Sequence, residues 1–264
     1  MKKTILITGA SSGIGYELAV VAARNGDTVI LAARRGDKLQ SLKQEMENEY
    51  QTKVHCVPVD LSEADAPAKL YQFVKSNNLH VDYLVNNAGF GDMQEFRNAD
   101  TLKIDEMIRL NVQSLTILTK LFLADMLKTG YGRIMNVAST AAFQPGPGMA
   151  VYYATKAYVL SFSQALGQEL KGSGVTVTAL CPGPTLSEFQ EVSGMGRSPL
   201  LRLMKVPTSE AVALYGYRAM MNGKLVAIEG LLNRILANSV KFIPRVIVLP
   251  LLHALQKSKQ SKGQ

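Results

Sequence analysis

Residues 4–15 read Thr-Ile-Leu-Ile-Thr-Gly-Ala-Ser-Ser-Gly-Ile-Gly, a β-rich apolar run that leads directly into a glycine-rich turn. The pattern predicts a buried strand, a tight turn, and a helix that begins at about residue 13. The first glycine permits the turn, the second lets the backbone approach a phosphate, and the third lets the helix pack closely on the strand. The amino end of that helix then presents N–H groups to a diphosphate. The stretch therefore predicts a dinucleotide site that includes Gly9, Ser11, Ser12, Gly13, Ile14 and Gly15.

The rest of the chain alternates short β-rich apolar runs with longer helical stretches. Strands are expected over residues 4–8, 28–33, 54–59, 83–86, 133–138 and 175–181. Helices are expected over residues 13–25, 36–50, 63–76, 101–129 and 152–171. Such alternation predicts an α/β fold, a Rossmann-like doubly wound parallel sheet in three layers. The carboxyl ends of the strands then meet at one edge of the sheet, where ligands bind.

The chain of 264 residues exceeds the usual domain size of about 150 residues, but α/β folds often exceed it as one domain. We expect one catalytic and cofactor-binding domain over residues 1–230, with residues 183–207 as a substrate lid and a further helix over residues 209–221. Residues 231–264 are expected to extend this domain with helices. The composition, 47% hydrophobic and 19% charged, excludes a disordered or collagen-like chain. Two cysteines exclude a disulfide scaffold and a four-cysteine zinc site, and no metal is predicted.

The net charge of +8 is concentrated in the last quarter of the chain, because residues 195–264 carry eleven Lys and Arg against two Asp and Glu. This asymmetry indicates either an anionic partner, such as a membrane surface or an acyl carrier, or a solvated face without a partner. No nucleic-acid-binding motif accompanies the basic residues. The tail over residues 229–256 is also apolar, and no uncharged apolar stretch is long enough to span a membrane. Burial in the core or in a subunit interface is the preferred interpretation, and a helix on anionic lipid is the alternative.

The amino terminus also bears on location. The apolar run after Lys2 and Lys3 is too short for a signal peptide, so a cytoplasmic protein is expected, with peripheral membrane contact left open.

The end of the second strand selects between the two nicotinamide dinucleotides. An acidic residue at this place holds a free ribose 2′-hydroxyl, but the sequence there is Ala32-Ala33-Arg34-Arg35. The Arg34 guanidinium is suited to a 2′-phosphate, so NADP(H) is the predicted cofactor; the alternative is a solvated arginine pair. Asp60 follows the third strand and is placed to accept a hydrogen bond from an adenine amino group, unless it caps the next helix. Leu61 belongs to the same predicted site.

Tyr152 and Lys156 lie four residues apart and share one face of a predicted helix. A neighbouring ammonium is expected to lower the pKa of the tyrosine, which makes it a proton donor for an alkoxide. Ser139, thirteen residues earlier and just after a strand, is suited to hold the substrate oxygen. Tyr71 and Lys75 repeat the spacing but have Pro58 at the equivalent place, so they are interpreted as an ordinary amphipathic helix. Tyr153 has no lysine four residues on and is assigned to packing or to the pocket wall.

In these motifs the chain resembles the short-chain dehydrogenase/reductase family, in its single-domain type. The resemblance covers residues 4–190 and rests on the glycine-rich turn, Asn86-Asn87-Ala88-Gly89, Asn111, Ser139, Tyr152 with Lys156, and Pro182-Gly183. It implies a catalytic tetrad of Asn111, Ser139, Tyr152 and Lys156, in which Asn111 holds a relay water and Lys156 binds the nicotinamide ribose. It also implies cofactor contacts from Asn87, Ala88, Gly89, Tyr152, Lys156, Pro182, Gly183 and Thr185, with Ser187 as a further candidate.

The carboxyl end departs from the family. Many members end in a strand followed by Asp-Gly-Gly at a tetramer interface, whereas this chain has Ile228-Glu229-Gly230 and a further tail. The resemblance implies a homo-oligomer. Because the motif at the tetramer interface is altered, the choice between dimer and tetramer stays open.

The sequence thus predicts NADPH-dependent reduction of a ketone, reversible as alcohol oxidation. An apolar pocket is expected from Phe90, Met93, Phe96, Phe143 and Met149 together with apolar residues of the lid, and it favours a lipophilic substrate. No arginine stands out as a clamp for a substrate carboxylate, although Arg197 and Arg202 would serve if the lid folds inward. Two alternatives remain: a 3-oxoacyl-thioester reductase of lipid metabolism, and an NADP(H)-binding sensor or scaffold without turnover.

Overall fold

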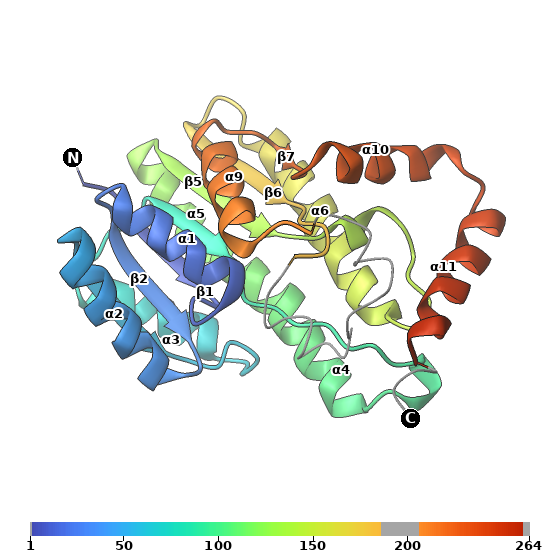
Figure 1. The fold of residues 1–264 in the computed structure, drawn as a ribbon. Helices are drawn as coiled ribbons and strands as arrows, with labels where there is room; N and C mark the ends of the chain where they lie inside the picture. Colours follow the sequence, from blue (N-terminus) through green and yellow to red (C-terminus); the bar gives the residue numbers. More distant parts are fainter. Residues whose placement is uncertain (1, 186–205, 261–264) are drawn as a thin grey trace.

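The computed structural model describes residues 2–185 and 206–260 of the chain (Figure 1). Its centre is a parallel sheet of seven strands in the order β3-β2-β1-β4-β5-β6-β7. The strands are β1 (Thr4–Thr8), β2 (Thr28–Ala33), β3 (Val54–Pro58), β4 (Tyr83–Asn86), β5 (Gly132–Val137), β6 (Val175–Leu180) and β7 (Val226–Ala227). The chain reverses its direction of travel across the sheet between β1 and β4, which is where α/β sheets open a crevice for ligands.

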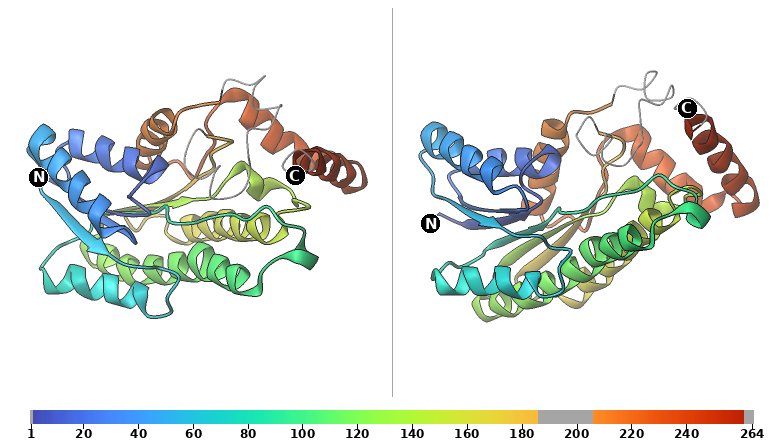
Figure 2. Two further views of the ribbon diagram at one scale, coloured as in Figure 1. Left: turned by 60° about the horizontal axis from the view of Figure 1, so that its bottom comes forward. Right: turned by 90° about the horizontal axis from the view of Figure 1, so that it is seen from below.

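Helices cover both faces of the sheet, as Figure 2 shows. One face carries α1 (Gly13–Arg24), α2 (Gly36–Tyr50) and α9 (Ser209–Met221). The other carries α3 (Ala66–Ser76), α4 (Thr101–Ile108), α5 (Leu115–Thr129) and α6 (Ala150–Glu169). Alternate residues of β1 enter different cores, with Ile5 and Ile7 packed toward α1 and Leu6 toward α3 and α5. The predicted doubly wound α/β fold in three layers is confirmed.

The predicted helix over residues 101–129 has the right extent but is not one regular helix. A π-helical segment over Arg109–Ser114 separates α4 from α5. The helix expected over residues 63–76 begins later, at Ala66, with a proline in its first turn. Proline fits there because its missing N–H would have no partner in the helix.

Two helices follow β7 and extend the chain at the end of the molecule opposite α2 (Figures 1 and 2). They are α10 (Leu231–Ser239) and α11 (Arg245–Gln260), and Pro250 lies inside α11. No helix in the described part of the chain is both long enough and apolar enough to cross a membrane.

Candidate active site

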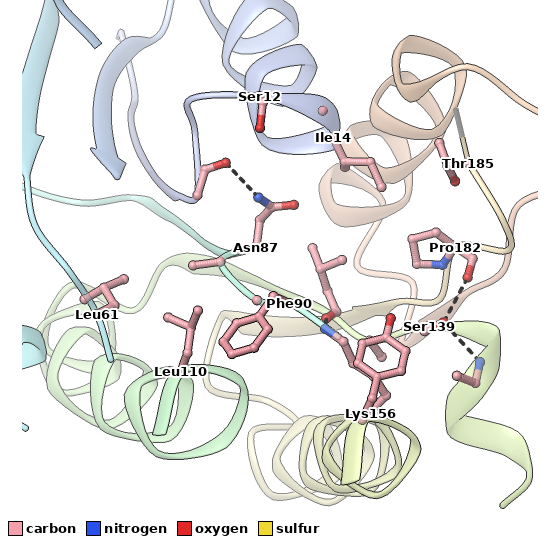
Figure 3. Close-up of a pocket in the computed structure, with 18 of the residues that line it drawn as sticks. Ser12, Ile14, Leu61, Asn87, Phe90, Leu110, Ser139, Lys156, Pro182 and Thr185 are labelled. Atoms are coloured by element: carbon pink, nitrogen blue, oxygen red, sulfur yellow. Dashed lines mark hydrogen bonds between the residues drawn. The ribbon is translucent and has the colours of Figure 1, made fainter. Parts of the chain in front are cut away.

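A cavity of about 480 Å³ lies along the carboxyl ends of strands β1 to β6. Figure 3 shows its two ends, with Leu61 at one and Ser139, Lys156 and Pro182 at the other. The predicted site residues that line it are Gly9, Ser11, Ser12, Gly13, Ile14, Arg34, Asp60, Leu61, Asn87, Ala88, Gly89, Ser139, Tyr152, Lys156, Pro182, Gly183 and Thr185. Gly15 and Asn111 lie behind the cavity wall, and Ser187 lies outside the described residues, as do Arg197, Arg202 and most of the predicted lid.

The glycine-rich turn has the geometry that a diphosphate requires. Gly9 and Gly13 adopt positive φ angles of 65° and 57°. A Cβ atom on Gly15 would lie 2.3 Å from the carbonyl oxygen of Gly9, so only glycine lets α1 approach the strand this closely. The Ser12 side chain does not cap α1, and the first turn holds no acidic residue. The N–H groups at this helix end are therefore directed at the cavity without a competing carboxylate, which fits the diphosphate of a dinucleotide.

Hydrogen bonds between two loops fix the floor of this turn. The Thr8 hydroxyl accepts bonds from the backbone N–H groups of Asn87 and Ala88, both at 3.0 Å. The Asn87 side chain donates in return to the carbonyl oxygens of Thr8 and Gly9, at 3.0 and 3.1 Å. Thr8 is almost completely buried. These hydrogen bonds tie the loop after β1 to the loop after β4, and Thr8 is a positioning residue that the sequence analysis missed.

Two arginines and one carboxylate surround the end of the cavity at β2 and β3. Arg34 is exposed, and its guanidinium lies 3.8 Å from the Asp60 carboxylate. Asp60 does not cap a helix: its Oδ1 accepts bonds from the N–H and hydroxyl of Ser62, which closes a turn before α3. Arg35 donates to the hydroxyls of Ser11 and Ser12, at 3.0 and 3.1 Å. The second arginine therefore belongs to the phosphate turn itself, a contact that the sequence analysis did not predict.

Ser139, Tyr152 and Lys156 meet at the other end of the cavity. The Ser139 hydroxyl accepts a bond from the backbone N–H of Ala141 at 3.0 Å and is also bonded to Tyr152. Tyr152 and Lys156 are both buried residues of α6. They lie on the same side of the helix, because residues four apart are neighbours on a helix surface. The Lys156 Nζ donates to the carbonyl oxygen of Val137 at 2.8 Å and lies 5.8 Å from the centre of the Tyr152 ring.

The electrostatics of this pair differ from the prediction. Burial raises the pKa of Tyr152 above its ordinary value of 10, and the Ser139 hydrogen bond lowers it by a smaller amount. Burial also lowers the pKa of Lys156 to about 8. The expectation that Lys156 lowers the pKa of Tyr152 is wrong for the protein without its cofactor, because the ammonium is bonded to Val137 and desolvation dominates. Tyr152 is therefore a neutral phenol at neutral pH, which is the form that donates a proton.

Asn111 lies in the π-helical segment and is 1% exposed. Its side chain donates to the carbonyl oxygen of Phe90 at 2.9 Å and to the Thr155 hydroxyl at 3.1 Å, and it accepts from the Phe90 N–H at 3.1 Å. A Cβ atom on Gly89 would lie 2.8 Å from Asn111 Oδ1 and 3.5 Å from Lys156 Nζ. The absence of a side chain at Gly89 thus lets Asn111 and Lys156 border the same small space. π-helical turns are frequent at functional sites.

The second tyrosine–lysine pair is separate from the cavity. The Tyr71 hydroxyl donates to Asp125 at 2.9 Å, and the Lys75 ammonium lies 3.1 Å from the same carboxylate oxygen. Both side chains therefore join α3 to α5, as expected for an amphipathic helix. Tyr153, in contrast, lines the cavity, which agrees with its assignment to the pocket wall.

The predicted apolar pocket is assembled only in part. Phe90 and Met149 line the cavity, together with Leu110 and Gln144, which the sequence analysis missed. Met93 packs against the apolar cluster that includes Met107 and Tyr152, without lining the cavity. Phe96 is 67% exposed, and Phe143 packs against the apolar cluster that includes Leu160.

Comparisons with known proteins identify the family to which the chain is similar. The family model described as short chain dehydrogenase matches residues 3–196. The very-long-chain 3-oxoacyl-CoA reductase of Homo sapiens is 29% identical over 97% of this chain and 83% of its own length. The 3-oxoacyl-[acyl-carrier-protein] reductase FabG of Aquifex aeolicus is 32% identical over 69% of this chain and 73% of its own.

A solved structure, the short-chain dehydrogenase from Sphingobium yanoikuyae in complex with NADPH, has a TM-score of 0.82 and 30% identity. The similarity covers 90% of this chain and 92% of that one. The fold, the glycine-rich turn and the match to more than two thirds of the sequence lead to one conclusion: the chain belongs to the short-chain dehydrogenase/reductase family, oxidoreductases that use NAD(P)(H) and act on alcohol and ketone groups.

Proposed function

We propose that the protein reduces a lipophilic ketone with NADPH, and that Tyr152 donates the proton. The observation that carries the proposal is the meeting of Ser139, Tyr152 and Lys156 in one cavity with the glycine-rich turn. A sensor or scaffold needs the turn but has no use for a buried phenol beside a serine hydroxyl. The buried ammonium of Lys156 is also difficult to explain without a function, because burial disfavours its charged form.

The chain's own residues account for the proton and for the orientation of the substrate. A bound nicotinamide cofactor supplies the hydride. Ser139 holds the carbonyl oxygen with its hydroxyl, beside the Tyr152 phenol. Tyr152 transfers its proton to that oxygen as negative charge develops there, since its raised pKa keeps it protonated. Lys156 binds the nicotinamide ribose, and Asn111, bordering the same space, orders the proton path.

The preference for NADPH is supported by the arginines at the end of β2. Arg34 lines the cavity at this end and is exposed, so its guanidinium is available to a 2′-phosphate. The Asp60 carboxylate accepts two hydrogen bonds from Ser62 and lies 3.8 Å from the Arg34 guanidinium, so these contacts compete with a bond from a free ribose 2′-hydroxyl.

The apolar wall supports a lipophilic substrate. Phe90, Leu110 and Met149 line the cavity. A 3-oxoacyl thioester is the second candidate, since both 3-oxoacyl reductases named above match this chain over at least two thirds of its length. A 3-oxo group is a ketone, so the same residues serve either substrate.

The test is NADPH oxidation, followed at the nicotinamide absorbance, with quinones, steroids, 3-oxo esters and 3-oxoacyl thioesters. We expect Tyr152→Phe to lower kcat by about 10²- to 10⁴-fold, the usual contribution of a general acid, while NADPH binding is kept. Tyr153→Phe and Tyr71→Phe are the matched controls, and both should retain turnover. A Tyr152→Phe enzyme with normal kcat would contradict the assignment of the acid. Tight NADPH binding without turnover of any ketone would favour the sensor alternative.

A further inference from the structure

The two helices after β7 expose an unusual amount of apolar surface. We refer to residues 231–260 as the C-terminal arm. Leu231 is 70% exposed, Phe242 86% and Val246 79%. Among the side chains of the arm that the structure describes, the other large apolar ones that are exposed are Leu232, Ile235, Leu236, Ile243 and Ile247. Burial in the monomer's core, one of the readings taken from the sequence, is therefore wrong for these eight residues.

The exposed residues follow a repeated pattern. Leu231–Leu236 reads Leu-Leu-Asn-Arg-Ile-Leu, and eleven residues later 242–247 reads Phe-Ile-Pro-Arg-Val-Ile. Each segment has two apolar residues, a spacer, an arginine and two further apolar residues. In α10 the four apolar positions fall on one side of the helix. Arg234 and Arg245 are both exposed beside them.

Contacts on the opposite side of α10 fix this orientation. Ala237 is 2% exposed and packs in the apolar cluster that includes Phe143. Asn233 donates to the carbonyl oxygen of Glu229 at 3.0 Å, and its amide lies against Gly183, where an added Cβ would be only 2.5 Å away. The inner side of α10 is thus seated on the body of the protein beside the cavity, and the leucines and isoleucine face outward.

The charge of the arm indicates which kind of partner covers its exposed apolar side chains. Residues 230–264 contain six Lys and Arg and no Asp or Glu. In a symmetric dimer formed through this face, like charges would meet across the interface. An acidic carrier protein would match the charge but leaves the apolar side chains without a partner. An anionic lipid surface satisfies both features, because apolar residues enter the acyl boundary while arginines contact the headgroup phosphates.

We propose that the C-terminal arm docks the protein on the surface of an anionic lipid bilayer, with the apolar residues of 231–236 and 242–247 inserted and Arg234 and Arg245 on the phosphates. None of the described helices is able to span the bilayer, so the contact is peripheral. The docking proposal does not depend on which ketone is reduced. It is tested by binding of the protein to vesicles, not by turnover.

The experiment is co-sedimentation of the full chain with vesicles of phosphatidylcholine alone and of phosphatidylcholine with phosphatidylglycerol. One variant combines Ile235→Ser with Phe242→Ser, and another combines Arg234→Gln with Arg245→Gln. The control combines Leu127→Ser with Lys171→Gln, an exposed leucine and an exposed lysine at the ends of α5 and α6. Melting temperature checks that each variant is folded.

We expect binding to the anionic vesicles only, and weaker binding at about 1 M salt, where the screening length falls to about 3 Å. Partitioning should fall about fivefold for each arginine removed and at least about tenfold in the apolar variant, with no change in the control. Equal binding to neutral vesicles, or unchanged binding of both arm variants, would overturn the proposal. So would a dimer in size-exclusion chromatography that these substitutions dissociate without any vesicle binding, since the face would then belong to a second copy.

Discussion

Lys156 is a buried ammonium that donates a hydrogen bond to a backbone carbonyl oxygen, and its titration should be visible in the stability of the cofactor-free protein. Its pKa is about 8 when folded and 10.5 in an ordinary environment, so between these values the unfolded chain binds more protons. Folding therefore becomes more favourable through Lys156 as the pH rises over this range. We predict that the Tm of Lys156→Met minus the Tm of the wild type decreases from about pH 7 to about pH 10, because only the wild type gains stability through Lys156 over this range.

The control for this measurement is Lys171→Met, because that lysine is exposed. It measures the effect of the same Lys→Met change on Tm at each pH when no buried side chain is removed. If the Tm difference between Lys156→Met and the wild type did not change with pH, the lowered pKa of the folded Lys156 would be contradicted.

Arg34 and Arg35 are adjacent, yet their contacts assign them different effects on cofactor binding. Arg34 lies 3.8 Å from the Asp60 carboxylate, whereas Arg35 donates hydrogen bonds to the hydroxyls of Ser11 and Ser12 in the phosphate turn. We predict that Arg34→Ala weakens NADPH by about tenfold or more, the loss of a charge-assisted bond, and leaves NADH unchanged. Arg35→Ala should weaken both dinucleotides, because both share the diphosphate. Fluorescence titration with each dinucleotide checks this, and equal losses in the two variants would contradict it.

Residues that carry chemistry at a defined spacing were predictable from the sequence, and their surroundings were not. Tyr152, Lys156 and Ser139 are identified by their separations of four and thirteen residues. The bond of Lys156 to Val137, the role of Thr8 and the contact of Arg35 depend on side-chain direction across strands that are distant in sequence. For the same reason the sign of the Tyr152 pKa shift was mispredicted, since burial of the phenol outweighs the hydrogen bond with Ser139.

At the scale of elements, the strands were predicted within a residue or two, and irregular helical turns were missed. The π-helical segment over Arg109–Ser114 was taken as part of one helix because its apolar residues continue the helical pattern. The widened turn is what carries Asn111 to Phe90 and Thr155. The spacing of apolar residues does not reveal that a helical turn contains one extra residue. The π-helical segment could therefore be recognised only in the structure.

The packing of α1 on β1 depends on Gly15, which offers a prediction about that helix. An added Cβ would be 2.3 Å from the Gly9 carbonyl oxygen and 2.5 Å from the Asn87 amide. We predict that Gly15→Ala displaces α1, lowers Tm by several degrees and abolishes dinucleotide binding. The matched control is Gly26→Ala, where φ is 81° but no atom lies within 4 Å of the added Cβ. That variant should lose only about 1 kcal/mol of stability from backbone strain and still bind the dinucleotide.

For the whole molecule, the sheet, its two helical layers and the edge that carries the cavity followed from the β–α alternation and from right-handed crossovers. The exposed face of the C-terminal arm did not follow, because a tail that is both apolar and basic is compatible with a core, an interface or a lipid surface, and a core or an interface was the preferred interpretation. The exposure of residues such as Leu231 and Phe242 excludes the monomer's core for them, and the charge of the arm is what favours lipid over a second copy.

The two parts of the arm should contribute unequally to stability and turnover. A chain that ends at Ser239 keeps α10, with Ala237 buried and Asn233 against Gly183. We predict that it retains its Tm within a few degrees and its turnover. A chain that ends at Glu229 uncovers both contacts, so its Tm should fall and its KM should rise. Thermal unfolding and steady-state kinetics of the two truncations check this; equal behaviour would show that α10 does not support the cavity.

The position of β1 in the middle of the sheet has a consequence for synthesis. β1 pairs with β2 on one side and β4 on the other, but β2 is complete at residue 33 and β4 begins only at residue 83. At about 5–20 residues per second, the ribosome needs about 3 to 10 seconds to make the intervening stretch. During that time the buried, apolar β1 presents a free edge to which another nascent chain can add. A translational delay between β3 and β4 therefore raises aggregation more than an equal delay after β6.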